Sequence, residues 1–354
     1  MVSHAGIAGR LPNDTTFRSY SSAQVLEYAR GRGGYPQKLI EEIVALHAST
    51  ESAFESLLDI GCGPGTATRQ LAAHFDHATG IDPSPAMVQS AIELGGDARK
   101  APIRFIQDET EVCKNIPDQS IDLITAATSA HWFDFEQFWP TAARILKPNE
   151  TVAIFNMWRI YCHPSTPHAN EIQRILFELE QGPDALGPYQ KPGNWSVMNE
   201  YKDLRMPWSI FPPCSSFSET SYRRQVWNEK GLPSKDGSYV YGERTTTLEE
   251  AEQAIATISA VTRWREAHAE LANTPEDCVR AASAQIRRIL GPEEADRFTM
   301  VAATVLITVK KAQMAAVQLV AVVLPLEGPV VRVVRPNVSK LSNTLDKWVV
   351  ITMA

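Results

Sequence analysis

A buried strand that runs directly into a glycine-rich turn and a helix constrains this sequence more than any other feature. The segment Leu57–Thr68 reads LLDIGCGPGTAT, in which the apolar residues lead into Gly61, Gly63 and Gly65. Glycine tolerates positive φ angles and lets a ligand approach the backbone closely. Because strand, turn and helix follow one another without a gap, the segment predicts the ligand-binding edge of an α/β sheet.

The spacing of the glycines distinguishes two classes of ligand. A dinucleotide-binding turn has its third small residue five positions after the first, where it seats the pyrophosphate on the helix N-terminus. Here that position is Thr66, and the third glycine comes one residue earlier. The tighter turn suits S-adenosylmethionine, whose methionine part carries no phosphate. A purely structural turn is the alternative.

Acidic residues after the neighbouring strands support an adenosine ligand. Asp82 ends the next predicted strand, where its carboxylate can accept both ribose hydroxyls; the alternative is an N-cap role, which Ser84 could fill instead. Asp108 follows the third strand and is placed either to meet the adenine amino group or to lie in a solvated loop. The predicted cofactor-binding residues are therefore Asp59, Gly61, Gly63, Gly65, Asp82 and Asp108.

From residue 56 onward, short apolar runs alternate with helical stretches. Predicted strands cover 57–60, 78–81, 103–106, 121–125 and 151–156, and predicted helices cover 66–74, 85–94 and 135–146. This alternation indicates crossover connections and a parallel sheet with helices on both faces. Later in the chain, helices are predicted over 248–264 and 276–290 and a strand over 304–309.

The same pattern suggests three regions. Residues 1–50 are expected to form an N-terminal helical cap, with helices over 21–30 and from Pro36, and residues 51–311 the main domain. Within that domain the regularity is lost over 158–242, which predicts a lid insertion that carries specificity or, alternatively, an irregular part of the same core. Residues 312–354 are expected to be a C-terminal extension of unknown role.

Composition excludes several classes of protein. With 34 basic and 41 acidic side chains, the net charge is −7, so the broad positive field that nucleic-acid binding requires is missing. The five cysteines show neither a disulfide ladder nor a zinc spacing, which predicts a reducing, cytoplasmic location and no metal site. The most apolar stretch, 315–331, is shorter than a bilayer span and contains Gln318 and Glu327, so a membrane protein is not expected.

Longer strings resemble a known family. The segments DIGCGPGTAT and TAATSAHWFDFEQF, together with Asp82, resemble class I methyltransferases of the fungal trans-aconitate methyltransferase group. The strings LGPYQKPG and VTRWREAHAEL are similar to segments of that group as well. The glycine motif is shared by most class I methyltransferases, whereas the string SAHWFD is specific to fewer of them. The group's Arg-Pro-x-Tyr-Pro signature is lengthened here to Arg30-Gly31-Arg32-Gly33-Gly34-Tyr35-Pro36.

The resemblance implies an α/β fold of the Rossmann-like class I methyltransferase type. Its seven-stranded sheet would have six parallel strands and a reversed last strand, with a lid insertion after strand five. The implied reaction transfers a methyl group from S-adenosylmethionine to a carboxyl or enol oxygen of a small-molecule acid. That acceptor would be trans-aconitate-like or a fungal secondary-metabolite intermediate.

Two residues after the fourth predicted strand are the candidates for catalysis. His131 and Trp132 lie at the strand end that faces the cofactor, or else they pack with Phe133 and Phe135 as an aromatic cluster. A carboxylate acceptor is already ionised at neutral pH and needs no base. A phenol or enol would need one, and His131 is the obvious candidate.

An acidic acceptor also needs cations to bind it. The candidates are Arg30, Arg32, Arg159, Arg223, Arg224, Arg263 and Arg265, most of which must be surface charges. Trp158, Tyr189 and Trp195 could shape an apolar pocket or pack in the core. A second hypothesis is a regulator or interaction protein that binds S-adenosylmethionine with little turnover.

Overall fold

The computed structural model describes residues 16–49, 52–240, 244–294, 298–313, 319–321 and 334–336. The chain divides into two units, Met1–Ala312 and Gln313–Ala354. In the second unit, which contains most of the predicted C-terminal extension 312–354, the described residues form two short antiparallel strands, β9 (Leu319–Ala321) and β10 (Val334–Pro336). Most of that extension lies outside the described residues.

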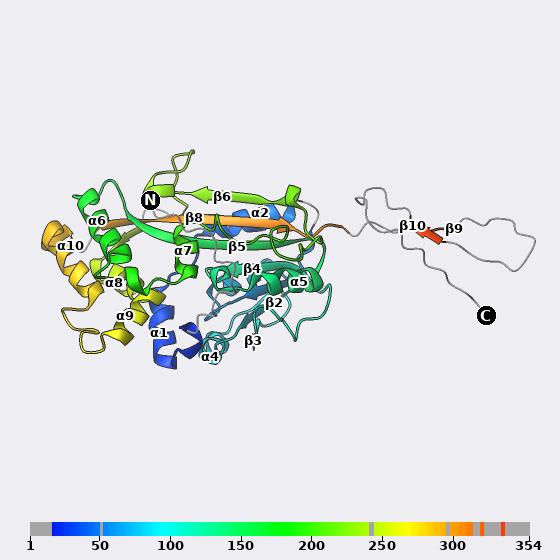
Figure 1. Cartoon of the computed structure of the whole chain (residues 1–354), viewed down its shortest axis with the longest axis horizontal. Coiled ribbons are helices and arrows are strands. Elements are labelled where there is room, and N and C mark those ends of the chain that lie inside the picture. Colours follow the sequence, from blue (N-terminus) through cyan, green and yellow to red (C-terminus); the bar gives the residue numbers. More distant parts are fainter. Residues whose placement is uncertain are drawn as a thin grey trace, which may run out of the picture. The chain divides into compact units, whose positions relative to one another are not determined.

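The first unit is built on an eight-stranded sheet with the order β3-β2-β1-β4-β5-β8-β6 and with β7 paired to β8 (Figure 1). The pairs from β3 to β5 are parallel, whereas β8 is antiparallel to both β5 and β6. β6 therefore runs in the same direction as β1 to β5. The strands are β1 (Ser56–Ile60), β2 (His77–Asp82), β3 (Arg104–Gln107), β4 (Ile121–Ala127), β5 (Leu146–Cys162), β6 (Arg223–Trp227), β7 (Arg244–Thr246) and β8 (Phe298–Lys310).

The prediction of six parallel strands and a reversed last strand is confirmed, with β7 as a short addition. The sixth parallel strand, β6, lies inside the range 158–242 that was predicted to be a lid, so this range is not wholly an insertion. The fifth and last strands are also longer than predicted. β5 and β8 pair from Thr151 with Lys310 as far as Cys162 with Met300, which satisfies their backbone groups well beyond the parallel part of the sheet.

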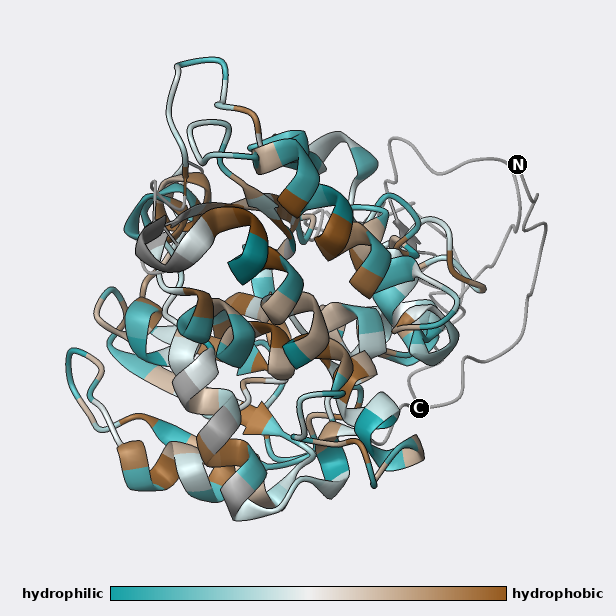
Figure 2. Ribbon diagram, turned by 90° about the vertical axis from the view of Figure 1, so that its left-hand side faces the viewer, coloured by the Kyte–Doolittle hydropathy of each residue, from teal (hydrophilic) through white to brown (hydrophobic). Residues whose placement is uncertain are grey.

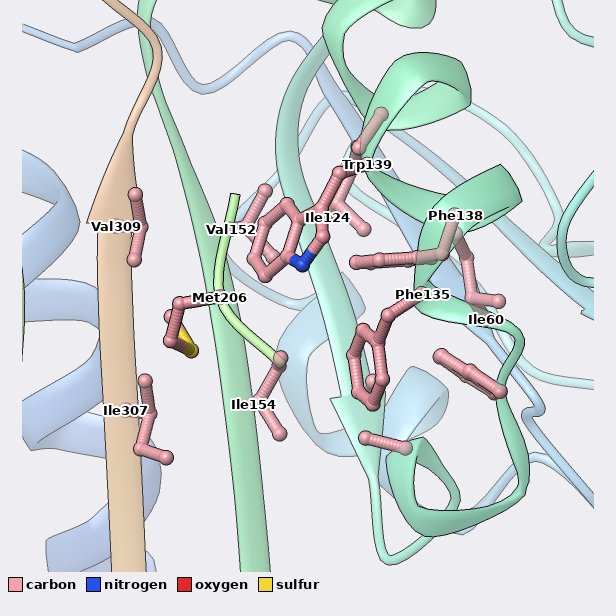
Figure 3. Close-up of a cluster of buried hydrophobic side chains, with 14 of the residues drawn as sticks. Ile60, Ile124, Phe135, Phe138, Trp139, Val152, Ile154, Met206, Ile307 and Val309 are labelled. Atoms are coloured by element: carbon pink, nitrogen blue, oxygen red, sulfur yellow. The ribbon is translucent and has the colours of Figure 1, made fainter. Parts of the chain in front are cut away.

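One face of the sheet packs against the aromatic helix α5 (Phe135–Ile145). Figure 3 shows Phe135, Phe138 and Trp139 of α5 facing the aliphatic side chains of β5, such as Ile154. The Trp139 indole is fully buried and donates its N–H to the carbonyl of Arg205 at 2.7 Å. Burying an aromatic side chain of this size stabilises the fold by about 3 kcal/mol.

The opposite face is covered by α2 (Gln37–Ala48) and α3 (Thr66–Ala72). Leu39, Ile40 and Ile43 recur at helical spacing on α2 and pack with Leu71 of α3 and Phe155 of β5. Although α2 falls in the range predicted as an N-terminal cap, 1–50, it belongs to the core of the sheet. α4 (Pro85–Leu94) follows β2.

A group of helices lies beyond the carboxyl ends of the parallel strands, at the left of Figure 1. They are α1 (Ser22–Gly31), α6 (Ala169–Gln181), α7 (Pro192–Met198), α8 (Leu248–Ala256), α9 (Ser259–Ala267) and α10 (Cys278–Glu294). Figure 2 looks onto this end and shows hydrophobic and hydrophilic residues on each of the helices. α6, α8, α9 and α10 share one apolar core.

The predicted helix 248–264 is in fact two helices. α8 ends before Thr257, whose hydroxyl donates to the carbonyl of Ala254 at 2.6 Å, and α9 begins after Ile258. A threonine hydroxyl that bonds to its own backbone competes with helix continuation. In the part of the chain that the structure describes, no helix is both long enough and apolar enough to cross a bilayer.

Candidate functional site

A cavity of about 520 Å³ opens where the parallel strands end and the helices begin. Such a volume lies within the range typical of small-molecule sites. Its walls come from the loops after β1, β2 and β4, from the extended part of β5 and β8, and from α6, α7 and α8. The segment from residue 16 to 36, here called the N-terminal segment, adds a further wall through Phe17, Tyr28, Arg32 and Tyr35.

The glycine loop after β1 forms the first wall. Gly65 has a φ of +83°, and an added Cβ would lie 2.7 Å from the ring of Phe105, so this glycine allows the loop to pack closely. Gly63 has a φ of +54° and lines the cavity, and an added Cβ there would meet no protein atom within 4 Å. The space in front of Gly63 is therefore available to a ligand. Gly61 also lines the cavity.

Asp82 lies beside this loop at the end of β2. Its carboxylate accepts the backbone N–H of Gly63 at 2.9 Å through one oxygen and the N–H of Ser84 at 2.9 Å through the other. Burial raises the pKa of Asp82 to about 6, against the opposing effect of these two N–H donors. The N-cap of α4 is Ser84, whose hydroxyl accepts the N–H of Met87. Asp82 therefore faces the cavity with lone pairs available for a ligand's hydroxyls.

The other two predicted carboxylates lie elsewhere. Asp59 is fully buried below the loop, where it accepts the hydroxyls of Thr68 at 2.6 Å and Thr125 at 2.8 Å, and it does not line the cavity. Asp108 also does not line the cavity, because its oxygens accept N–H groups of its own loop, from Glu109 at 2.8 Å and Asn115 at 3.1 Å. The structure thus brings Asp82 together with Gly61 and Gly63 at the cavity, whereas Gly65, Asp59 and Asp108 do not line it.

His131 and Trp132 also line the cavity, in the 3₁₀ turn η2 (Ala130–Trp132) after β4. The Trp132 ring is in edge contact with Phe17 of the N-terminal segment, with ring centres 6.3 Å apart. Gly193 of α7 approaches so closely that an added Cβ would lie 2.8 Å from this ring. The string LGPYQKPG therefore places α7 directly against the predicted catalytic turn.

His131 is a neutral group in this environment. Its Nδ1 lies 2.7 Å from the hydroxyl of Tyr201, which is itself buried. Burial, together with the smaller effect of the positive charge of Arg32, lowers the pKa of His131 to about 3. A neutral imidazole carries one N–H, so when Tyr201 donates to Nδ1 that N–H is on Nε2. His131 is thus suited to donating a hydrogen bond and poorly suited to being a general base.

The predicted cations separate into two groups. Arg223 donates to backbone carbonyls at the surface, Arg224 binds Glu200, Arg265 binds Asp277, and Arg263 holds Tyr189 and Asn194 in place. Arg32 and Arg159, in contrast, line the cavity, together with Arg18, which the sequence analysis did not select.

The cavity arginines differ in what neutralises them. Arg18 is 3.0 Å from Glu109, and Arg159 is 2.9 Å from Glu180. The Nε of Arg32 donates to Thr257 at 3.0 Å, and no carboxylate of the described residues forms an ion pair with Arg32. The side chain of Arg30 lies outside the described residues.

Comparison with known proteins gives the class of this site. Residues 58–154 match the model of the methyltransferase domain family. A probable S-adenosylmethionine-dependent methyltransferase of Saccharomyces cerevisiae, CRG1, is 26% identical over 67% of this chain and 79% of its own length. The chain carries an S-adenosylmethionine-dependent methyltransferase domain. The matched range includes the glycine loop, Asp82 and the His131 turn.

One further sequence relative and one solved structure are also similar to this chain. A trans-aconitate 2-methyltransferase of Klebsiella pneumoniae is 37% identical, but over only 28% of this chain and 38% of its own length. The structure of a putative type II methyltransferase of Anaeromyxobacter dehalogenans superposes with a TM-score of 0.55 and 21% identity, covering 80% of this chain and 97% of that chain. This likeness shows a shared fold.

The cavity residues of the methyltransferase domain fit its cofactor. The space before Gly63 suits a ligand held against the backbone, and the Asp82 carboxylate suits the two ribose hydroxyls. Further cavity residues that the sequence analysis missed are Cys62, Pro83, Met87, Thr110, Thr128 and Ser129. They follow the same strand ends, so strand boundaries were the signal that could have revealed them. Within the described part of the chain, no three His, Cys, Asp or Glu residues gather as a metal site.

Two of the three aromatic residues predicted for the lid lie away from the pocket. Tyr189 and Trp195 do not line the cavity: Tyr189 contacts the ring of His268, and Trp195 is 45% exposed. The side chain of Trp158 lies outside the described residues.

Proposed function

We propose that this methyltransferase methylates a carboxylate oxygen of a small-molecule acid. The observation that carries the proposal is Arg32, which lines the cavity on the side of His131 and is not neutralised by a carboxylate of the described residues. An uncompensated guanidinium in a partly closed site favours an anionic partner, which it can bind through two parallel hydrogen bonds.

Methyl transfer to a carboxylate oxygen needs no general base. S-adenosylmethionine supplies an electrophilic methyl group on a positively charged sulfur. The carboxylate oxygen forms the new C–O bond as the C–S bond breaks, which leaves a methyl ester and neutral S-adenosylhomocysteine, and no proton is transferred. The protein contributes alignment of the reacting groups, which can lower a barrier by about 7–11 kcal/mol.

The environment of His131 favours a carboxylate over a phenol. A phenol would have to lose its proton, but a histidine whose pKa is lowered to about 3 has little tendency to accept one. A hydrogen bond from Nε2 to the acceptor would hold the carboxylate instead. Trp132, beside it, would exclude water and shape the site.

The acceptor belongs, in this proposal, to the trans-aconitate-like acids or the related acids of fungal secondary metabolism. The partial similarity to trans-aconitate methyltransferases supports this choice. A cytoplasmic location is part of the same proposal, supported by five cysteines that are all unpaired thiols.

The test compares Arg32→Gln with Arg223→Gln, an exposed arginine that bonds only to nearby carbonyls. Release of S-adenosylhomocysteine is followed by mass spectrometry over a panel of small unsaturated acids, phenols and polyketide-type acids. We expect R32Q to lower kcat/KM for the preferred acid about 10- to 100-fold, because a hydrogen bond to a charged group contributes about 1.5–3 kcal/mol. Its dissociation constant for S-adenosylmethionine should change clearly less than kcat/KM, because on the N-terminal segment itself the variant loses the bond to Thr257, whose hydroxyl is a neutral acceptor.

Other results would contradict the proposal. Turnover of phenols but not of acids would exclude a carboxylate acceptor, and an equal loss in R223Q would exclude a special role for Arg32. Tight cofactor binding without turnover of any acceptor would favour the regulator that the sequence analysis set against the enzyme.

A further inference from the structure

Part of the cavity lies away from the cofactor loop and is lined by aliphatic side chains. We call it the apolar chamber and define it by Ile160, Leu176, Leu179, Ala254, Ile255 and Met300. They come from the extended part of β5 and β8 and from the helices α6 and α8. Ile160 is 38% exposed although it lines the cavity. An exposed aliphatic side chain in a concave wall gains from contact with an apolar ligand.

The chamber adjoins a second void in the helical core. This small void lies between α6, α8 and α10 and shares Leu176, Leu179, Ile255 and Met300 with the main cavity. The helices behind the chamber therefore leave unfilled apolar space. This void has a volume of only about 10 Å³, so the apolar body of a ligand would lie in the main cavity, in front of these side chains.

The polar groups of the chamber do not supply a second anion site. Arg159 is paired with Glu180, and its guanidinium lies over the ring of Phe177 with 4.8 Å to the ring centre. Glu250 is held by the backbone N–H of Thr247 and the hydroxyl of Thr246 in the cap of α8. A second or third carboxylate of a polycarboxylic acid would therefore be buried here without a cation to pair with, which is costly.

We propose that the acceptor is an amphipathic acid, whose carboxylate is bound near Arg32 and His131 and whose apolar body occupies the apolar chamber. This inference rests on the proposed carboxylate acceptor and specifies its class: an acid with one carboxylate and an aliphatic, isoprenoid or aromatic body. Of the two kinds of acceptor proposed above, it selects the secondary-metabolite acids over trans-aconitate, which carries three carboxylates. The polar wall and the apolar wall belong to one continuous cavity, so a single acceptor can contact both.

The test measures binding, not turnover, so that it is independent of the reaction. Butanoate, hexanoate, octanoate and decanoate are titrated into the full-length protein saturated with S-adenosylhomocysteine, and dissociation constants are measured by calorimetry. We expect the affinity to rise about fourfold per added methylene, as for transfer of a methylene from water to an apolar site.

Two variants of α8 provide a matched pair. Ala254 lines the cavity, whereas Ala256, on the same helix, does not. A254L should fill the chamber and remove most of the advantage of decanoate while leaving butanoate binding unchanged, and A256L should keep the dependence on chain length. If A254L does not fold, I160T serves instead, because threonine retains the β-propensity of the strand and shortens the apolar wall.

The outcomes separate this inference from the proposed function. Equal affinity for butanoate and decanoate, or an equal loss in A254L and A256L, would overturn the apolar chamber as an acceptor site. Affinity that depends on chain length without release of S-adenosylhomocysteine from any acid would leave the chamber in place and contradict carboxyl methylation.

Discussion

Two buried carboxylates below and beside the glycine loop have different tasks although burial raises the pKa of each to about 6. Asp59 is satisfied by two threonine hydroxyls and ties β1 to α3 and β4. Asp82 is held by backbone N–H groups and faces the cavity. A carboxyl whose pKa is raised destabilises the folded protein once it ionises, so the retention of a charge at Asp82 is consistent with a binding role.

Asp82→Asn should weaken binding of S-adenosylmethionine about 10- to 100-fold, because a hydrogen bond to a charged acceptor is replaced by one to a neutral group. In the wild-type protein, binding should weaken as the pH falls below 6 and Asp82 takes up a proton. In D82N this dependence should become much weaker, because the carboxyl that still titrates near pH 6, Asp59, does not line the cavity. Calorimetric titration between about pH 5 and 8 measures both effects.

Asp108→Asn is the matched control for this prediction. Its carboxylate is engaged within its own loop, so we expect the dissociation constant of the cofactor to change less than threefold. A loss as large as that of D82N would mean that Asp108 turns to the adenine, as the sequence analysis expected.

The melting temperature of D82N should stay within a few degrees of wild type. Two effects oppose each other in this variant. Removing the buried negative charge stabilises the fold, whereas the NH₂ group of the new amide faces one of the two backbone N–H groups that the carboxylate accepted.

At the scale of elements, different glycines of the glycine loop serve packing and ligand binding. Gly65 is pressed against Phe105, whereas Gly63 faces open space in the cavity. Both have positive φ, so any other residue carries a strain of about 1–2 kcal/mol at either position. Only at Gly65 does a steric clash add to it.

Gly63→Ala should therefore fold with a small decrease in melting temperature and lose at least tenfold in affinity for S-adenosylmethionine. Gly65→Ala should lose clearly more stability, since overpacking adds about 1–3 kcal/mol to the strain. Thermal unfolding and cofactor titration of both variants give the comparison. If G63A bound the cofactor normally, the space before Gly63 would not be the cofactor site.

Sequence patterns predicted some strands of the sheet correctly and missed others. The strands β1 to β4 were predicted to within two residues of their ends, because each is a short apolar run between turn signals. The extensions of β5 to Cys162 and of β8 back to Phe298 were missed, because their stability comes from pairing with each other and not from a local pattern. β6 was missed for a similar reason, since an edge strand with the sequence RRQVW has little apolar signal.

The whole first unit is tied together at its C-terminal end by Lys311 and Ala312. Lys311 is buried and donates to the carbonyl of Leu146 at 2.5 Å, and the N–H of Ala312 donates to Ser216 at 2.8 Å. The division between the two units comes directly after Ala312.

A chain that ends at Ala312 should keep its melting temperature within a few degrees and its cofactor affinity unchanged. A chain that ends at Val309 should melt several degrees lower, because it loses the bonds of Lys310 to His47 and of Lys311 to Leu146. Thermal unfolding of both chains, with the full chain as reference, measures the difference. Loss of folding in the longer of the two would show that the C-terminal unit belongs to the core.

Part of the candidate site depends on contacts between residues that are far apart in the sequence, and that part could not be predicted. That Gly61, Gly63, Asp82, His131 and Trp132 line one cavity could be predicted, because strand ends meet at one edge of a parallel sheet. Arg32 could be selected but not distinguished from six other arginines, because pairing with distant residues such as Glu200 and Asp277 decides which charges are already neutralised. Phe17 and Arg18 of the N-terminal segment gave no local signal.

The N-terminal segment touches both sides of the cavity. Tyr20 packs on Met87 of the cofactor side and bonds to Thr262 of α9, and Arg32 bonds to Thr257. A ligand on either side thus helps to hold the segment closed, so cofactor and acceptor should each raise the other's affinity by the same factor. If the products leave only when these contacts break, the rate at which the segment opens would set an upper limit on turnover.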